Sequence, residues 1–236
     1  MKIILLSINQ FKEKDAVVSA MGPTGKMTFI VKALYDPKSR NAQLNAPLSV
    51  IDAEFVEGDY QYPVLKRFEV VSSPMKNSGD YEYLSTILIL GESTNKLVQE
   101  EDYALIYEWL YKALEKLDKS KTYYSILLIY IANILKVSGY EFEVNRCVMC
   151  GSTKSIVSFS FNDGGFLCAN CLDEEDKTDL NKHEMLLIRE VFNAKSYEIH
   201  EDLYSKNEKV HLLFKFYEFI NDSFSTKINN ILMLNN

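Results

Sequence analysis

The chain has 236 residues, of which 47% are hydrophobic and 12% aromatic, and its 26 basic and 33 acidic side chains give a formal net charge of −7. This composition is typical of a soluble globular protein and excludes collagen-like and intrinsically disordered chains. The longest uninterrupted apolar run, residues 126–132, is too short to span a bilayer. Charged residues directly follow the N-terminal apolar segment, without a small-residue cleavage site. We therefore expect a cytoplasmic protein whose thiols stay reduced.

Charge is distributed unevenly along the chain. Residues 1–50 contain seven basic and three acidic side chains, so the remainder of the chain carries a net charge of −11. A polyanion such as DNA would be repelled by most of this protein and tolerated mainly at its N-terminal part. On charge alone, the basic segment is either a nucleic-acid-binding surface or an ordinary solvated surface, and both interpretations stay open.

The first third of the chain has the pattern of short β-strands. Segments rich in β-branched and aromatic residues alternate with turns rich in Gly, Pro, Asn and Asp, at residues 2–10, 16–21, 26–34, 48–56 and 65–73. Five such strands within about 75 residues predict a small closed or partly closed barrel of the OB type. We place this domain at residues 1–76.

After the polar residues 72–80, apolar residues recur three and four positions apart, which is the period of a helix. Helical patterns cover residues 81–97, 99–120, 122–139, 172–194 and 207–234, with Gly139 as a stop signal and the acidic residues 173–176 as a loop. We therefore predict a multi-domain α+β protein in which a helical domain, residues 77–236, follows the barrel.

All four cysteines lie within this helical domain, in two CxxC pairs that are separated by 17 residues: Cys147, Cys150, Cys168 and Cys171. Two such turns place four thiolates tetrahedrally around zinc, and Gly151 with Gly164 and Gly165 supplies the permissive backbone. The spacing predicts an inserted zinc module at about residues 145–173 with one Zn²⁺ per chain. Four protein ligands leave no open position, so the zinc would be structural. A metal-free remnant and a redox dithiol are the alternatives.

The sequence offers no catalytic constellation. Its three histidines, His183, His200 and His211, lie beside no cysteine and in no HExxH arrangement, and no nucleophile elbow is present. We therefore expect a protein that is not an enzyme.

Three stretches carry a resemblance to a known family. They are "FKEKDAVVSAMGPTGKMTFIVKALYDPKSR", "LKVSGYEFEVNRCVMCG" and "FSFNDGGFLCANC". Together with the order of basic barrel, acidic helical domain and four-cysteine module, they make the chain similar to the RecO family of bacterial recombination mediators. The resemblance implies DNA contacts by Lys26, Lys32, Lys38 and Arg40, and zinc ligation by the four cysteines. At the positions where the family usually has Gly and then one or two Arg, this chain has Ala33, Leu34, Tyr35 and Asp36. The ring of Tyr35 can stack on a base there.

The resemblance implies a role in DNA repair. RecO-like proteins bind single- and double-stranded DNA, anneal complementary strands, recognise the C-terminal tail of single-stranded-DNA-binding protein, and with RecR help to load RecA. This implies a nucleoid-associated protein. We expect the tail groove among the helices between Tyr81 and Gly139, with Lys112, Lys116, Lys121 or Lys136 as its cation. A zinc-ribbon adaptor without DNA affinity is the main alternative, and a metal-dependent nuclease is a further one.

Overall fold

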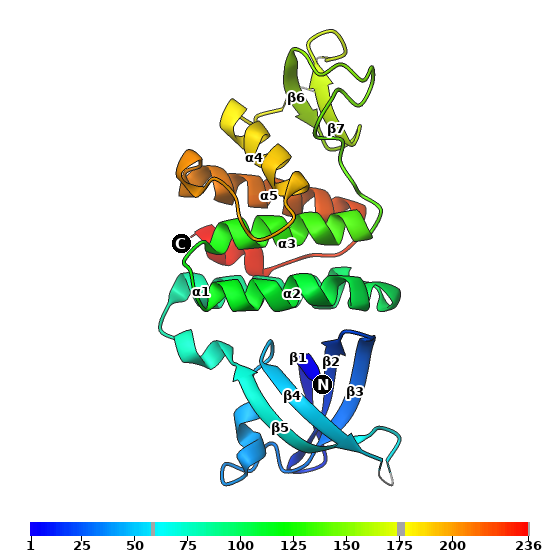
Figure 1. The fold of residues 1–236 in the computed structure, drawn as a ribbon, viewed down its shortest axis with the longest axis vertical. Helices are drawn as coiled ribbons and strands as arrows, with labels where there is room; N and C mark the ends of the chain where they lie inside the picture. The colour runs from blue at the N-terminus through cyan, green and yellow to red at the C-terminus, as the bar shows by residue number, and fades with distance from the viewer. Residues whose placement is uncertain (58–59, 174–177, 236) are drawn as a thin grey trace. The chain divides into compact units, whose positions relative to one another are not determined.

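The computed structural model describes residues 1–57, 60–173 and 178–235, and it has the predicted α+β class. A barrel of strands is followed by helices, and a two-stranded hairpin with the four cysteines is inserted among them (Figure 1). The chain forms two compact units, Met1–Lys119 and Ser120–Asn236. The sequence predicts a domain boundary between residues 76 and 77. The strands end and the helices begin near this position, but the domain boundary itself stays a prediction.

The barrel is built from β1 (Lys2–Phe11), β2 (Asp15–Gly22), β3 (Gly25–Val31), β4 (Val50–Val56) and β5 (Val64–Ser72). The strands are joined in the order β1-β2-β3-β5-β4, and the antiparallel pairing of β1 with β4 closes the sheet. Only the contact between β3 and β5 is parallel. This order and closure are those of an OB-type barrel, so the prediction is confirmed.

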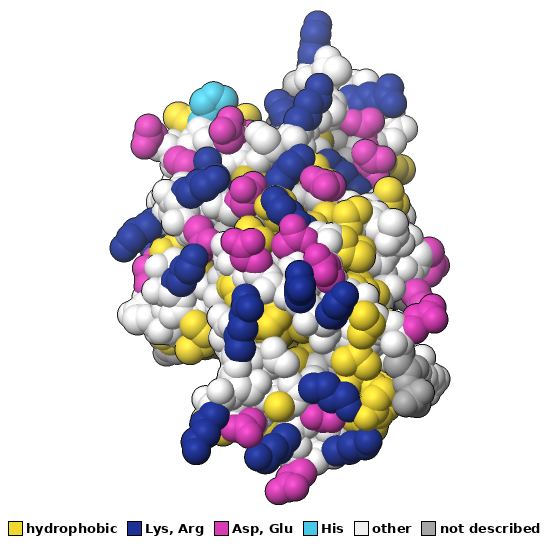
Figure 2. Space-filling view, turned by 60° about the horizontal axis from the view of Figure 1, so that its bottom comes forward, with side chains coloured by type: hydrophobic (Ala, Val, Ile, Leu, Met, Phe, Trp, Pro, Cys, Tyr) yellow, Lys and Arg dark blue, Asp and Glu magenta, His cyan; other side chains and the backbone are white. Residues whose placement is uncertain are grey.

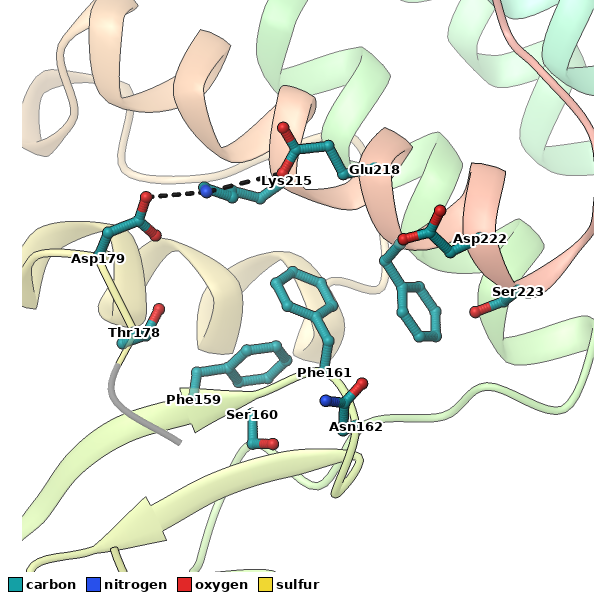
Figure 3. A pocket seen from close by; sticks show the side chains of 11 residues that line it. Phe159, Ser160, Phe161, Asn162, Thr178, Asp179, Lys215, Glu218, Asp222 and Ser223 are labelled. Atoms are coloured by element: carbon teal, nitrogen blue, oxygen red, sulfur yellow. Dashed lines mark ion pairs between the residues drawn. The ribbon is translucent and has the colours of Figure 1, made fainter. Parts of the chain in front are cut away.

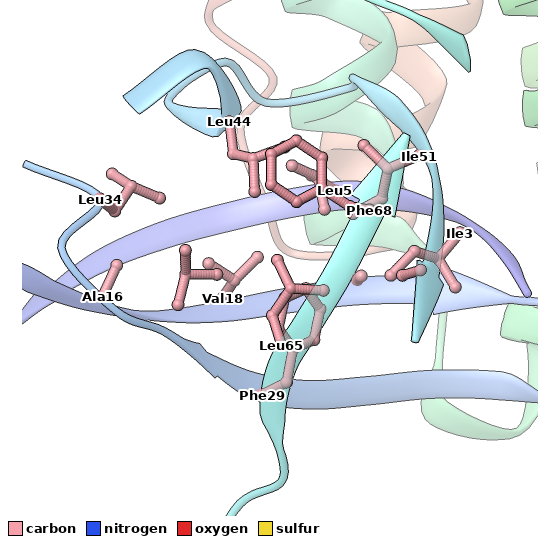
Figure 4. Close-up of a cluster of buried hydrophobic side chains, with 13 residues drawn as sticks. Ile3, Leu5, Ala16, Val18, Phe29, Leu34, Leu44, Ile51, Leu65 and Phe68 are labelled. Carbon is pink, nitrogen blue, oxygen red and sulfur yellow. The ribbon is translucent and has the colours of Figure 1, made fainter. Parts of the chain in front are cut away.

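Alternation along the strands fills the barrel. Side chains such as Leu5, Val18 and Phe29 point inward and are fully buried, as Figure 4 shows. The connection between β3 and β4, which carries a short 3-10 helix (η1, Arg40–Leu44), adds Leu34 and Leu44 to the same cluster.

Two predicted strands are shorter than the pattern suggests. Ala33 has a φ of 50° and Leu48 a φ of 61°, and such left-handed backbone ends a strand. Accordingly, β3 stops at Val31 and β4 begins at Val50.

Two long helices belong to the same compact unit as the barrel. After a 3-10 turn (η2, Pro74–Asn77), α1 (Tyr81–Leu97) begins with Asp80 as its cap, and α2 (Tyr103–Leu117) follows another 3-10 turn (η3, Glu100–Asp102). The hydroxyl of Tyr107 donates a hydrogen bond of 3.0 Å to the carbonyl of Lys2, so α2 is tied to β1. Apolar residues at helical spacing on α2, including Ile106, Leu110 and Leu117, are buried.

The second unit contains α3 (Tyr123–Val137), α4 (Lys182–Asn193) and α5 (Lys206–Ser223), with the hairpin of β6 (Ile156–Ser160) and β7 (Gly165–Cys168) inserted after α3. α3 packs against both α4 and α5, and every residue from Tyr123 to Leu135 is buried. At its end, Gly139 has a φ of 87° and the N–H of Tyr140 bonds to the carbonyl of Leu135, so the predicted stop is confirmed.

The last two helices are shorter than their patterns. α4 begins only at Lys182, because Asn181 and Glu184 form a capping box there. A 3-10 turn, η5 (Glu201–Leu203), precedes α5. α5 ends at Ser223, and the C-terminal part of the predicted helix instead forms the 3-10 helix η6 (Asn230–Asn235). Most of the predicted acidic loop, residues 174–176, lies outside the described residues. No helix of the described chain is long and apolar enough to cross a membrane.

Candidate metal centre and nucleic-acid interface

The fold brings the four cysteines together at one end of the β6–β7 hairpin. Their sulfur atoms all lie within 4.8 Å of one another, and the Sγ atoms of Cys150 and Cys168 are 3.7 Å apart. Zinc–sulfur bonds of about 2.3 Å in a tetrahedron put the sulfurs about 3.8 Å apart. Cys147 and Cys168 are buried, whereas Cys150 is exposed. The predicted ligands are therefore close enough together to hold one metal ion.

Tight turns hold the sulfurs in this arrangement. The N–H of Gly151 bonds to the carbonyl of Cys147 at 2.8 Å, and the N–H of Cys171 bonds to that of Cys168 at 3.0 Å. Gly151 has a φ of 74°, which a side chain would disfavour. Each CxxC pair therefore forms one compact knuckle.

The double glycine serves the other end of the hairpin. Gly164 has a φ of 80° in the turn, and a Cβ atom on Gly165 would lie 2.4 Å from the carbonyl oxygen of Glu143. The backbone of Glu143 forms a bridge with Gly165 and bonds to Gly164 and Phe166 at 2.9 Å. The segment that enters the cysteine module thus runs directly beside β7.

The thiols differ in their proton affinity. Burial raises the pKa of Cys147, but hydrogen bonds from the backbone N–H groups of Cys168, Cys150 and Met149 outweigh burial and lower that pKa to about 6. Hydrogen bonding with Cys150 and Cys168, together with burial, raises the pKa of Cys171 to about 12. The cluster thus stabilises one thiolate readily and resists further ionisation, which a divalent cation would compensate. The soft donor set and the sulfur spacing fit a closed metal site with a structural role.

On the barrel, the predicted DNA-binding residue Lys32 belongs to a cluster of charged and aromatic side chains. Its ammonium group bonds to the hydroxyl of Tyr60, lies 4.0 Å from the centre of that ring and is 3.3 Å from a carboxylate oxygen of Asp15. Lys12 lies over the same ring at 4.9 Å and over Phe11 at 5.3 Å. The hydrogen bond to Tyr60 raises the pKa of Lys32. The pKa of Tyr60 is lowered by its hydrogen bond with Lys32 and by the positive charge of Lys12. The first shift shows that Tyr60 and Asp15 stabilise the charged form of Lys32, and the second shows that the two ammonium groups favour ionisation of the Tyr60 hydroxyl.

The other predicted residues are spread over the barrel. Lys38 is exposed and has no side-chain partner among the described residues, whereas the guanidinium of Arg40 bonds to the carbonyl of Phe68 at 2.9 Å. Tyr35 packs partly against the barrel core. Lys26 opens β3, about 20 Å from Lys32 along an extended strand, and lies over the ring of Tyr103 at 5.3 Å.

Sequence reasoning missed Phe11, Lys12 and Tyr60. Phe11 and Lys12 lie at the β1–β2 turn, and Tyr60 lies in the β4–β5 connection. OB-type barrels contact oligonucleotides with these two loops. The predicted barrel topology could therefore have pointed to Phe11, Lys12 and Tyr60. Figure 2 shows Lys and Arg side chains mixed with apolar and acidic ones on the lower part of the surface, which carries the barrel.

The four lysines considered for the tail groove are divided between the two compact units. Lys112 and Lys116 belong to the first compact unit, and Lys121 and Lys136 belong to the second. Lys112 lies 3.9 Å from Glu108, and Lys136 donates to the carbonyl of Phe192. Burial lowers the pKa of Lys136.

Comparison with known proteins gives this geometry its context. A family model described as "Recombination protein O C terminal" matches residues 78–219, which is more than half of the chain. The chain belongs to the RecO family. RecO-family proteins act in DNA repair and recombination, so the resemblance seen in the sequence is confirmed.

Individual relatives agree with the family match. The chain is 27% identical over 183 residues to the DNA repair protein RecO of Shouchella clausii, covering 74% of this chain and 69% of the relative. It is 24% identical over 201 residues to the DNA repair protein RecO of Caldanaerobacter subterraneus subsp. tengcongensis, covering 81% and 79%. The RecO protein of Halalkalibacterium halodurans is 23% identical over 180 residues, covering 73% and 68%. The similarity to each relative therefore extends over more than two thirds of both chains.

Proposed function

We propose that this RecO-family protein is a recombination mediator without catalytic activity that binds single- and double-stranded DNA on its barrel and anneals complementary strands. The observation that carries the proposal is the cluster that Phe11, Lys12 and Tyr60 of two loops form with Lys32, which follows β3, on an OB-type barrel. Ammonium groups contact phosphates and aromatic rings stack on bases, and neither reads sequence. DNA binding is therefore independent of base sequence.

Annealing follows from the same surface. Two complementary strands repel each other through their phosphates, and cations that neutralise part of that charge lower the barrier to pairing. The net charge of −11 outside residues 1–50 keeps DNA on the barrel and away from the helical part.

The partners that we propose are those of the family. With RecR, the protein loads RecA onto DNA that is coated with single-stranded-DNA-binding protein, in the cytoplasm at the nucleoid. The four cysteines hold one structural Zn²⁺, for which the support is the all-thiolate donor set and its spacing. Zinc supplies no chemistry to DNA in this proposal, because four protein ligands fill its coordination sphere.

The salt dependence of DNA binding tests where the DNA lies. Each phosphate neutralised on single-stranded DNA contributes about −0.7 to the slope of log affinity against log salt, so four contacts give a slope of about −3. Replacing Lys32, Lys38 and Arg40 with Ala should reduce the slope by about two units and weaken all oligonucleotides alike. The matched control removes the same charge elsewhere, at the exposed residues Lys119, Lys154 and Lys195.

The residues found only in the structure extend this test. Lys12→Ala should reduce the slope by a further ~0.7, whereas Tyr60→Leu should weaken binding without changing the slope, because stacking releases no counterions. A triple variant that keeps the wild-type slope, or whose losses depend on base sequence, would place the DNA elsewhere.

An annealing assay tests the mediator function as a whole. Complementary oligonucleotides coated with the cognate single-stranded-DNA-binding protein should anneal faster with this protein than without it. The Lys32, Lys38 and Arg40 variant should lose this acceleration, and the Lys119, Lys154 and Lys195 control should keep it. A protein-binding adaptor without DNA affinity would leave naked complementary strands unaffected even at low salt.

For the acidic tail of single-stranded-DNA-binding protein, one described cavity of about 220 Å³ has suitable chemistry. Ile156, Leu186 and Phe166 line it together with the cations Lys182 and Arg189. We propose this cavity as an alternative to the helices between Tyr81 and Gly139. With a fluorescent tail peptide, Lys182→Ala should weaken binding if the cavity is used, and Lys112→Ala should do so if the helices are used. Binding that neither variant affects would exclude both placements.

A further inference from the structure

A second surface of the helical unit has the opposite charge. Two adjoining cavities, of about 330 and 390 Å³, share the lining residues Phe161, Asn162, Phe219 and Ser223. The two cavities lie side by side between the turn of the β6–β7 hairpin and α5, and together they are called the groove below. Figure 3 shows Phe159 and Phe161 projecting from the hairpin toward α5, which carries Glu218, Asp222 and Ser223.

The floor of this groove is a fixed aromatic surface. The rings of Phe161 and Phe219 are stacked, with centroids 5.4 Å apart and an interplanar angle of 29°. Below them, Phe142 contacts both rings, at 5.7 and 5.3 Å. Tyr140, which is 36% exposed, lies edge-on to Phe219 at 5.4 Å. Rings that are locked in this way offer a preformed apolar surface at little cost in side-chain entropy.

Carboxylates surround the aromatic floor. Asp179, Glu218 and Asp222 line one cavity, and Glu141 and Asp163 line the other. Lys215 is the basic side chain in the lining of these two cavities, and it lies 2.8 Å from Asp179 and 3.6 Å from Glu218 (Figure 3). Asp163 and Asp222 have no cationic partner within the described parts of the chain. The groove therefore combines half-buried rings and the exposed Tyr140 with uncompensated negative charge.

We infer that this aromatic-acidic groove, formed by Tyr140, Phe161, Phe219, Asp163, Glu218 and Asp222, binds a basic peptide segment of a protein partner. An Arg or Lys side chain lies over the Phe161–Phe219 pair, whose faces attract a cation, and its charge is matched by Asp163 and Asp222. Neighbouring apolar side chains of the peptide cover Tyr140.

The negative charge of the groove also disfavours anionic ligands. DNA and an acidic peptide would place like charges beside Asp163 and Asp222, which is unfavourable. The 220 Å³ cavity lined by Lys182 and Arg189 offers an apolar wall with positive charge instead. The helical unit thus presents two surfaces of opposite preference, and the acidic groove does not compete with the barrel for DNA.

Fluorescence anisotropy of the full-length protein with a labelled peptide, Gly-Leu-Arg-Leu-Lys-Leu-Gly, tests the inference. The peptide in which citrulline and norleucine replace Arg and Lys keeps the shape and removes the charge, and it should bind at least about tenfold more weakly. The peptide with Glu at both positions should not bind. Equal binding of the basic and neutral peptides, binding of the acidic peptide, or no binding of the basic peptide would each overturn the inference.

Substitutions locate the binding. Asp163→Asn with Asp222→Asn should weaken the basic peptide by about tenfold, and Phe161→Leu, which keeps an apolar side chain, by about threefold. The control, Glu108→Gln with Glu115→Gln, removes two exposed carboxylates from α2 and should leave affinity unchanged. DNA binding should be unaffected in the Asp163 and Asp222 variant, so this result is separate from that of the proposed DNA function. Equal losses in the control would show nonspecific attraction and overturn the inference.

Discussion

The barrel and the cysteine hairpin are both β-structures, but different interactions hold them together. The barrel encloses a continuous apolar cluster with residues from all five strands, including Leu5, Val18, Phe29, Ile51 and Phe68. At the metal end of the hairpin, the buried cluster consists of Cys147, Leu167 and Cys168. A two-stranded hairpin is marginal in water, because it buries too little apolar surface to offset the entropy of ordering its chain. The barrel can therefore fold on burial alone, whereas the metal end of the hairpin depends on its thiolates.

The two ends of the hairpin also differ from each other. Away from the cysteines, Phe159 and Phe161 contact Phe142, and Phe161 contacts Phe216 of α5. Aromatic pairs of this kind add to the energy of burial. The aromatic end is thus anchored to helices, and a metal bound by the four cysteines would stabilise mainly residues 147–156 and 168–173.

This difference in packing affects where each structure can carry a binding surface. The barrel's core fills its interior, so its outer face and loops are free to carry cations such as Lys12 and Lys32. In the hairpin, the side chains that would bind a partner are the same rings that anchor it, and they are shared with α5. A ligand of the groove is therefore expected to stabilise the hairpin as well.

Removing the metal should have the largest effect and should separate the two structures. Structural zinc contributes about 10–16 kcal/mol of apparent binding free energy in small modules. Cys150→Ser should abolish bound metal and accelerate amide exchange in residues 147–156 and 168–173, while β1–β5 exchange as before. Elemental analysis and hydrogen-exchange mass spectrometry measure both. Met149→Ser, at an exposed neighbour, is the control. Wild-type protein that binds no metal, with four titratable thiols, would contradict the comparison.

The second change removes packing from the barrel. Phe29 is fully buried and its ring lies 4.9 Å from that of Phe55. Phe29→Ala should lower the free energy of unfolding of the first unit by about 3–5 kcal/mol, because a cavity replaces the ring. Urea unfolding followed by the fluorescence of Trp109, the single tryptophan, measures the loss. Phe29→Leu should lose less, and metal content should stay unchanged in both variants; a drop in metal content would show that the two structures are coupled.

The third change tests the close approach between Gly165 of β7 and the backbone of Glu143. Gly165→Ala forces a methyl group against the backbone of Glu143 and should destabilise the hairpin by about 1–3 kcal/mol. Gly79→Ala is the matched control, since a Cβ atom there would meet nothing within 4 Å. Thermal unfolding of both variants is the measurement. Equal melting temperatures would mean that the Glu143 segment yields easily.

The smallest effect is expected from a surface ion pair in the second unit. The hydrogen bond to Lys215 lowers the pKa of Asp179. A lowered pKa in the folded state contributes stability above the unfolded value of about 4, and this is lost as pH falls below it. Because Asp179 is 59% exposed, the pair contributes about 1 kcal/mol or less.

Urea titrations at two pH values measure this contribution. Asp179→Asn should lower the unfolding midpoint slightly at pH ~7 and leave it unchanged at pH ~2, where the carboxyl is protonated in both states. Asp202→Asn, at another exposed position, is the control. A larger loss at low pH than at neutral pH would reverse the sign of the argument.

Most of the element pattern could be predicted from the sequence. The helix predicted at residues 81–97 has the observed bounds of α1, because Asp80 caps it and apolar residues keep its period. Errors occurred at ends: β3 was predicted to residue 34 but stops at Val31, and the last helix stops at Ser223. Periodicity does not report left-handed residues such as Ala33 and Ser225, so it overestimates the length of an element.

The four candidate metal ligands can be identified from the sequence alone, since two CxxC turns at this spacing contain the whole donor set and need only a hairpin to meet. The surfaces that we propose for DNA and for protein partners cannot be identified in this way. Lys12, Lys32 and Tyr60 come from three connections that only barrel closure brings into one cluster. Similarly, Phe161 and Phe219 are 58 positions apart and stack only because the hairpin packs on α5. Local chemistry can be read from spacing, whereas a surface that is assembled from distant segments depends on the long-range packing of the core.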